Sequence, residues 1–417
     1  MTRPVFDYRR LVATVLACTL ALGGCGGGLV AGVGSGGSGV AEGTLSGFGS
    51  VIVDGIEYSE LALTEAERST LRLGQRVRLV FDSNNVAQSI EVLPQLRGPI
   101  TASLDDSGWL RLAGQWVRVV DNNDDSTRSG ITLVDGFADT EVSRPVIPAG
   151  EDAVVYGSWT WDNSKAAYVL VATRIEKLGS PADPVLLGGV AVAVGPNDFR
   201  LGSPDGTQVS AARLPALAEG SIVALLTART SVMAERATAQ YQGIVGTVTA
   251  QDVRDASLSA ADLSGFQSLR LGGLANAYDA TSATVTIQGT PLRLDRAVLP
   301  LAIGQFVRAN AAGLATEASA LQRSRSPIGQ AGDDGTGYVT ELKGLLSGVN
   351  WSETSVSFVL RGVPVQADAA QIADSCRAAG STRTLYVVVA GYAPSPVAPL
   401  RANAVNCTSD LSAASDV

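Results

Sequence analysis

The chain of 417 residues contains no histidine, and it is poor in aromatic residues (5%), cysteine (four) and methionine (two). Without imidazole it lacks Ser-His-Asp and Cys-His catalysis, histidine-ligated metal sites and histidine-based pH switches. The 31 basic residues are outnumbered by 40 acidic ones, which gives a net charge of −9. Because a nucleic-acid binder must neutralise phosphates, we expect no nucleic-acid partner, and we also expect no cofactor.

The first 24 residues resemble a bacterial export signal. A basic head with three arginines precedes an apolar run at 11–22, which is too short to span a bilayer. The run ends in Leu22-Gly-Gly-Cys25, which resembles a lipobox, where a signal peptidase cuts before a cysteine that carries diacylglycerol. We therefore predict lipid on Cys25 and attachment to a membrane through it. Cys18 fits the pattern less well and would leave with the signal.

The residue after Cys25 bears on the location of the protein. Lipoproteins retained in the inner membrane carry Asp at this position, whereas this chain has Gly26. The resemblance therefore implies a cell-envelope lipoprotein in the outer membrane that faces the periplasm. Residues 25–42 are rich in Gly, Ser, Val and Ala and predict a flexible tether.

The two remaining cysteines, Cys376 and Cys407, lie near the C-terminus. In an oxidising compartment such a pair is expected to form a disulfide. Two thiols are too few for an all-cysteine zinc site, and the spacing is not that of a Cys-x-x-Cys redox pair. The sequence therefore predicts a structural disulfide.

From Thr44 onward the apolar residues recur with a period of two, which is typical of strands. We therefore predict an all-β protein. Helical patterns are short, and each is expected to connect strands; the candidates are Leu61–Leu71, Ala250–Leu263 and Ala367–Ala379.

Three patterns recur in the same order along the chain: a hairpin around glycine, a turn that usually contains glycine before an alternating strand, and a closing strand that starts with alanine. In the first copy these are Val51-Ile-Val-Asp-Gly-Ile-Glu-Tyr58, Leu73-Gly-Gln-Arg-Val77 and Ala87-Gln-Ser-Ile90. The predicted organisation is a signal peptide at 1–24, a tether at 25–42, β modules at 43–94, 95–180, 185–241 and 242–324, a linker at 325–335 and a fifth β module at 336–410.

Five short strands with a hairpin and a short helical connection suit a small closed barrel of the OB type. A string of β-sandwiches is the alternative, and a short helix after the hairpin favours the barrel. The patterns at 43–178 resemble bacterial lipoprotein repeats known as domain of unknown function 5666. That resemblance supports the fold and the location, and it brings no catalytic residues.

Candidate chemistry is sparse. The loop Asp121–Ser126 offers several oxygen ligands for a cation such as calcium, but it lacks the glycine and the glutamate of an EF-hand, and a solvated hairpin tip explains it better. We predict no metal site. A glycosidase needs two carboxylates at a fixed separation, and the candidates stand in no recognisable motif. They are Asp105, Asp106, Glu151 and Asp152.

Tryptophans are concentrated in the second module. Trp159 and Trp161 should share one face of a strand while Thr160 points to the other. Buried, these rings fill a core; exposed, they stack on a sugar or on a partner. The candidate ligand-binding residues are Trp109, Trp159 and Trp161.

These observations favour a non-catalytic envelope lipoprotein whose tandem β modules act as binding or scaffold surfaces. An envelope protein or a polysaccharide would be its partner. A glycan-binding lipoprotein is the first alternative. A histidine-free hydrolase that uses carboxylates is the second.

Overall fold

The computed structural model describes residues 38–48, 50–120, 132–139, 145–211, 214–232, 247–256, 258, 262–263, 265–294, 302–312, 317–323, 330–331, 338–352, 354–360, 363–373, 376, 386–392 and 400–408. Strands dominate this part of the chain, which confirms the all-β prediction. Its helices are short: α2 (Glu65–Thr70), α3 (Arg229–Val232) and the 3-10 helix η2 (Ala369–Gln371). No helix within these ranges has the length and apolar character to cross a bilayer.

The first five strands pair in a closed circuit. They are β1 (Gly39–Phe48), β2 (Val51–Val53), β3 (Ile56–Tyr58), β4 (Arg76–Phe81) and β5 (Ala87–Val92). β1 pairs antiparallel with β2 and with β4, β2 pairs with β3, and β4 pairs with β5. A parallel bridge between Ser59 and Val86 then connects the ends of β3 and β5. The pairing thus returns to its start.

The same circuit occurs four more times in the described residues, each closed by a parallel pair between its third and fifth strands. We call the five circuits modules 1 to 5. Module 2 comprises β6 (Leu96–Ala102), β7 (Trp109–Leu112), β8 (Gln115–Arg118), β12 (Asp152–Asp162) and β13 (Ala167–Lys177). Module 3 comprises β14 (Val185–Val192), β15 (Asp198–Leu201), β16 (Gln208–Ser210), β17 (Ile222–Thr227) and β18 (Thr247–Asp255).

Module 4 comprises β19 (Ser268–Asp279), β20 (Thr284–Ile287), β21 (Thr290–Leu294), β22 (Phe306–Ala312) and β23 (Glu317–Arg323). Module 5 comprises β25 (Tyr338–Trp351), β26 (Ser355–Leu360), β27 (Val363–Asp368), β28 (Tyr386–Tyr392) and β29 (Leu400–Thr408). The short strands β9 (Leu133–Asp135), β10 (Ala138–Asp139), β11 (Pro145–Val146) and β24 (Gln330–Ala331) lie outside the circuits.

One backbone contact recurs in modules 1 to 4. The turn before the fourth strand, here called the lead-in turn, holds a glycine at positive φ, at 85°, 94°, 87° and 81° in Gly74, Gly150, Gly220 and Gly304. Each glycine N–H donates to the carbonyl of one residue in the opening strand, at 2.8–2.9 Å. The N–H of that same residue donates to the carbonyl of the residue after the glycine, at 2.8–2.9 Å. The partners in the opening strands are Leu45, Ile100, Ala191 and Ala275.

Two of the predicted helical connections are present in shortened form. α2 lies within the predicted range Leu61–Leu71 and starts with a capping box between Thr64 and Glu67. η2 lies within Ala367–Ala379, although Ala367 itself belongs to β27. Both helices follow the third strand of their module, which is where the barrel interpretation expected a helix.

The predicted tether at 25–42 ends too late. β1 begins at Gly39, and Gly39–Glu42 pairs with β4 on one side and with β19 on the other. Val40 and Ala41 are buried, at 0% and 2% exposure. A Gly/Ala/Val composition that looks flexible is therefore structured here, because two neighbouring strands and two modules cover it.

The predicted helix Ala250–Leu263 is wrong over its first part, and the predicted boundary at 241/242 differs from the observed pairing. β18 is a strand through Asp255, and it pairs parallel with β16 and antiparallel with β17. It therefore closes module 3, and module 4 opens with β19.

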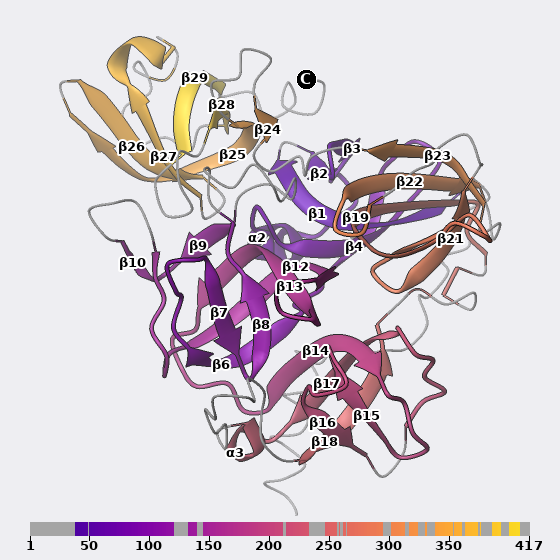
Figure 1. The fold of residues 1–417 in the computed structure, drawn as a ribbon. Helices are drawn as coiled ribbons and strands as arrows, with labels where there is room; N and C mark the ends of the chain where they lie inside the picture. Colours follow the sequence, from indigo (N-terminus) through magenta and orange to yellow (C-terminus); the bar gives the residue numbers. More distant parts are fainter. Residues whose placement is uncertain are drawn as a thin grey trace, which may run out of the picture.

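Strands of different modules also pair directly. β1 pairs parallel with β19 and, at Phe48 and Leu342, with β25, while β6 pairs with β14. These contacts join the circuits into sheets of 16 and 11 strands. Buried apolar side chains of modules 1 and 5 form one cluster, and those of modules 2 and 3 form another. Figure 1 shows β1 and β4 beside β19 and β22, with module 3 below module 2.

The predicted disulfide is confirmed. Cys376 and Cys407 are bonded, with Cα atoms 5.0 Å apart and side chains 3% and 8% exposed. The bond ties the segment after η2 to β29. The loop that the disulfide closes contains β28, the fourth strand of module 5.

Replacement of both cysteines by serine should destabilise module 5 by about 3–4 kcal/mol, because the unfolded chain regains the entropy of a loop of 31 residues. Hydrogen exchange followed by mass spectrometry should show exchange in β28 and β29 more than about a hundredfold faster. β7 and β8 in module 2 serve as the internal reference. Unchanged exchange in β28 and β29 would contradict the prediction.

Candidate functional site

The three candidate tryptophans lie in different environments. Trp159 in β12 is fully buried at 0% exposure, packs in the core that modules 2 and 3 share, and donates from Nε1 to Gln95 Oε1 at 3.1 Å. A ring in this position fills a core and touches no ligand. The interpretation of Trp159 as a binding residue is therefore corrected.

Trp161 lies at the end of β12 and is partly exposed. Its ring meets Tyr168 edge-on at 5.2 Å between centroids, and its Nε1 donates to Asn163 Oδ1 at 2.9 Å. Thr160 points to the opposite face, where its hydroxyl lies 3.5 Å from the carbonyl oxygen of Ala275 in module 4. The predicted alternation along this strand is thus confirmed.

Trp109 and Trp116 form the centre of a second aromatic group. Their rings meet edge-on with centroids 6.0 Å apart. Trp109 is 9% exposed and packs with apolar residues of modules 2 and 4, whereas Trp116 is partly exposed. The residues that surround the pair are Val120, Val169, Val171, Leu274 and Phe306.

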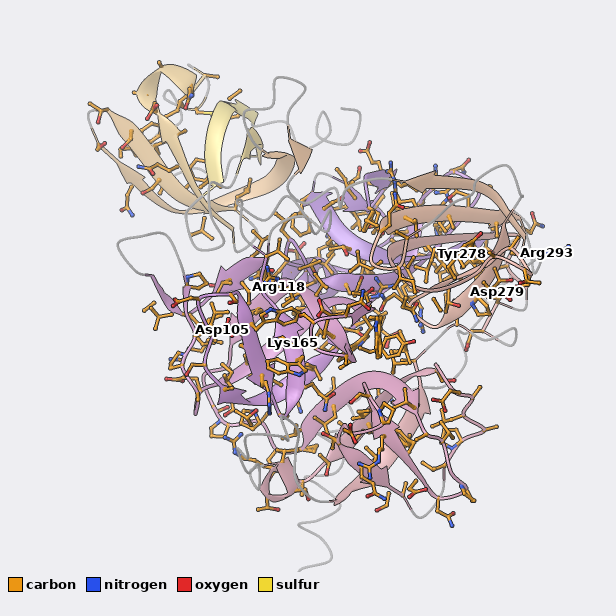
Figure 2. All side chains as sticks on the ribbon, viewed as in Figure 1. Asp105, Arg118, Lys165, Tyr278, Asp279 and Arg293 are labelled. Carbon is orange, nitrogen blue, oxygen red and sulfur yellow. A yellow bond between two sulfur atoms is a disulfide. The ribbon has the colours of Figure 1, made fainter. Side chains whose placement is uncertain are left out.

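Three cationic side chains lie over these two rings. Lys165 Nζ is 4.8 Å from the Trp109 centroid and 4.3 Å from that of Trp116. The Arg118 guanidinium is 5.1 Å from the Trp109 centroid, and that of Arg111 is 4.6 Å from the Trp116 centroid. Figure 2 shows Arg118 and Lys165 close together on module 2. We call these five residues the aromatic–cation cluster.

Strand pairing builds this cluster. Trp109 is opposite Arg118 and Arg111 is opposite Trp116 in the β7–β8 hairpin, while Leu110 and Val117 face the core. On this face each ring therefore has a cation next to it along its own strand and another directly across the hairpin. Such an arrangement favours cation–π contacts. Two Trp-x-Arg tripeptides around a hairpin glycine were the signal that sequence reasoning missed. Lys165, from the β12–β13 turn, had no such signal.

The candidate carboxylates serve structural contacts. Asp105 Oδ1 accepts the backbone N–H groups of Ser107 and Trp109, both at 2.9 Å, and so forms a turn. Glu151 pairs with Lys177 at 3.1 Å. Asp152 is 6% exposed, and its carboxylate accepts hydrogen bonds from Nη1 and Nη2 of Arg229. This ion pair connects module 2 to the segment after β17. Asp106 is exposed, and Asp121–Ser126 and Cys25 lie outside the described residues.

A buried ionic network lies where module 1 meets module 4. Arg76 in β4 is 1% exposed; its Nη2 is 2.7 Å from Glu42 Oε1, and its Nη1 donates to the carbonyl of Gly272 in β19 at 3.1 Å. Arg78 Nη2 binds the other oxygen of Glu42 at 2.8 Å and the carbonyl of Ala256 at 3.4 Å. The guanidinium groups of Arg76 and Arg78 therefore share one carboxylate, and each also donates to a backbone carbonyl outside module 1.

The charge state of Glu42 follows from these partners. Burial by itself raises the pKa of this carboxyl, but the attraction and hydrogen bonds of Arg78 and Arg76 outweigh it, so the pKa lies below its ordinary value. Glu42 is therefore ionised at neutral pH. Glu42 in β1 is thus bonded to Arg76 and Arg78 in β4, and Arg76 is bonded in turn to the backbone of β19.

Modules 1 and 2 meet at the first lead-in turn. The Thr173 hydroxyl donates to the carbonyl of Gly74 at 2.6 Å, and Arg174 Nη1 donates to that of Leu73 at 3.2 Å. A Cβ atom at Gly74 would lie 2.8 Å from the Thr173 carbonyl oxygen. The glycine thus serves both the positive φ of the turn and the close approach of module 2.

No family model matches the chain, and no curated protein matches it either. The resemblance of residues 43–178 to domain of unknown function 5666 therefore stays a prediction.

Arg76→Ala should lower the stability of module 1 by about 3 kcal/mol or more, because it leaves Glu42 buried with one partner fewer and frees the carbonyl of Gly272. Native-state hydrogen exchange of β1 and β4 measures the loss. Arg68→Ala is the matched control: it breaks an exposed pair with Glu65, which is worth less than about 1 kcal/mol. Equal effects of the two variants would rule out a stabilising role of the network.

Proposed function

We propose that the chain is a non-catalytic lipoprotein of the cell envelope, anchored through lipid on Cys25, whose tandem modules are small barrels of the OB type that act together as a scaffold. The direct strand pairing between modules supports this proposal most strongly. β1 pairs with β19 along Gly39–Glu42, and β6 pairs with β14. Modules joined through their backbones keep their surfaces in fixed relative positions, as a scaffold requires.

The pairing circuit supports the barrel part of the proposal. In every module the opening strand pairs with the second and the fourth, and the parallel pair of the third and fifth completes the ring. A ring in which each strand has two partners limits the length of strand edge that is open to aggregation. The short helices α2 and η2 after the third strands also favour an OB-type barrel, since an immunoglobulin-like sandwich would use another strand at this point.

The non-catalytic part rests on the roles of the carboxylates. Asp105 forms a turn, Glu151 pairs with Lys177, and Asp152 holds Arg229. A hydrolytic pair would need two carboxylates aimed at one substrate bond. These three point instead at protein partners.

Cys25→Ala should abolish incorporation of radiolabelled palmitate in cells and release the protein from the membrane fraction, because no thiol remains for the lipid. Cys18→Ala is the control and should leave the labelling intact. Labelling that persists in Cys25→Ala and is lost in Cys18→Ala would move the anchor to the earlier cysteine.

Binding of an acidic polysaccharide is a second candidate function, and the aromatic–cation cluster favours it. A neutral sugar stacks on a free indole face, whereas Lys165 and the arginines cover Trp109 and Trp116. Lys165 is partly exposed, and no acidic residue of the described part forms an ion pair with it. A carboxylated sugar would supply its anion and stack beside Trp116. The outer-membrane location, itself a proposal, would place such glycans within reach.

Trp116→Ala should weaken binding of a polyuronate about tenfold, through loss of the ring and of the surface that positions Lys165. Calorimetric titration of the purified protein measures the affinity, and thermal unfolding shows that the fold is retained. Trp161→Ala removes a partly exposed ring outside the cluster and should bind normally. Equal loss in both variants, or no binding by the wild type, would exclude this site.

A further inference from the structure

Asp54 stands at the seam where module 1 meets module 4. It lies in the β2–β3 turn with φ at 49° and is 3% exposed. Its Oδ1 accepts the N–H of Thr44 at 3.1 Å, and its carbonyl accepts a hydrogen bond from Arg308 Nη1 in β22 at 2.7 Å. One residue of a tight turn thus bonds to its own module and to another.

Two glycines make room for the Asp54 carboxyl. A Cβ atom on Gly43 in β1 would lie 1.9 Å from Oδ2, and one on Gly272 in β19 would lie 1.7 Å from it. These glycines follow Glu42 and Leu271, which are partners in the parallel register of β1 and β19. The carboxyl therefore fits over both strands of the seam, at a point where neither strand has room for a side chain.

The same placement leaves Oδ2 of Asp54 without a hydrogen-bond donor among the described residues, although the atom is fully buried. An ionised carboxylate with an unpaired oxygen is costly in such a position, and a neutral carboxyl much less so. The charged or titratable groups around it are Glu42 on β1, Arg76 on β4, Tyr58 on β3, Arg270 on β19 and Arg308 on β22.

The charged groups around Asp54 do not offset the effect of burial on its pKa. Burial raises the pKa of Asp54, the Thr44 N–H and the Arg76 and Arg308 guanidiniums lower it, and Glu42 raises it, so that it lies at about 7. The ordinary value is 3.8. This carboxyl is therefore half ionised near neutral pH, unlike that of Glu42 in β1, whose pKa is lowered.

We propose that the seam between β1 and β19 is a proton-sensitive joint, held closed by a neutral Asp54 carboxyl and loosened when that carboxyl ionises. The joint lies in the part of the chain that follows the N-terminal segment directly. Its response would change how firmly module 4 is held against module 1. The proposal depends on neither the lipid anchor nor the polysaccharide site.

The direction of the effect follows from proton linkage. Between pH 3.8 and 7 the closed state keeps the Asp54 proton while the opened state loses it, so opening becomes about tenfold easier for each pH unit. Above pH 7 both states are ionised and this contribution levels off. The stabilisation is complete below pH 3.8 and is lost as the pH rises through 7.

The test compares wild type with Asp54→Asn, a neutral side chain of the same shape that tolerates positive φ. Hydrogen exchange of the full-length protein gives protection factors for β1 and β19, corrected for intrinsic exchange, from pH 5 to 8. In wild type, protection should fall about tenfold between pH 6 and 8, and in Asp54→Asn this fall should be absent. Asp105→Asn removes an exposed turn carboxylate and should behave as wild type.

Identical pH profiles of wild type and Asp54→Asn would overturn the proposal. A measurement on the wild-type protein decides the matter even if the variant does not fold. With aspartate labelled by carbon-13, infrared spectra should show the carbonyl stretch of one protonated aspartic acid at pH 6 that disappears by pH 8. Absence of a protonated aspartic acid at pH 6 would refute the proposal independently.

Discussion

Modules 1 to 4 each depend on a reciprocal pair of backbone hydrogen bonds between the lead-in turn and the opening strand. Each pair ties a glycine at positive φ, such as Gly74, to a residue where the opening strand changes partner, such as Leu45. On one side of that point β1 pairs with β4, and on the other it pairs with β2. A short strand can serve both neighbours only if it bends there, and the two hydrogen bonds hold the bend. Because the contact uses backbone atoms, it constrains the side chains at these positions only through the glycine.

The space between modules is filled by polar and aromatic side chains as well as by apolar ones. Arg76 and Glu42 connect module 1 to β19, Arg229 and Asp152 connect modules 2 and 3, and Thr160 reaches the carbonyl of Ala275. Directional contacts of this kind specify one relative position, whereas apolar contact alone tolerates sliding. The cost is a set of buried charges that depend on one another, and among the described residues the Asp54 carboxyl keeps one oxygen without a hydrogen-bond partner.

The sequence was sufficient where a pattern depends on local backbone geometry. Glycine before an alternating strand, the hairpin Asp54-Gly55 and the cysteine pair all have a physical reason within a few positions or in the redox compartment. The sequence was insufficient where a segment far along the chain determines the local structure. Gly39–Glu42 has the composition of a tether and becomes a strand because β19, more than two hundred residues away, covers it.

The binding candidates show the same division. Alternation correctly placed Trp159 and Trp161 on one face of β12, but it carried no information on the depth at which each ring lies. The aromatic–cation cluster needed two facts that are separate in the sequence: the β7–β8 register and the position of the β12–β13 turn that supplies Lys165. Asp54 was hidden as an ordinary turn residue, since its burial comes from Gly272 and Arg308 in another module.

The position of β1 between β4 and β19 has a consequence for synthesis. A chain synthesised from its N-terminus completes β1 long before β19 exists, so one edge of Gly39–Glu42 stays bare while the intervening modules fold. A bare edge invites pairing with a neighbouring chain. A charged residue on an exposed edge discourages such pairing, and Glu42 stands at the end of this edge until β19 covers it. The residue that locks the finished seam is thus also the one that guards the unfinished one.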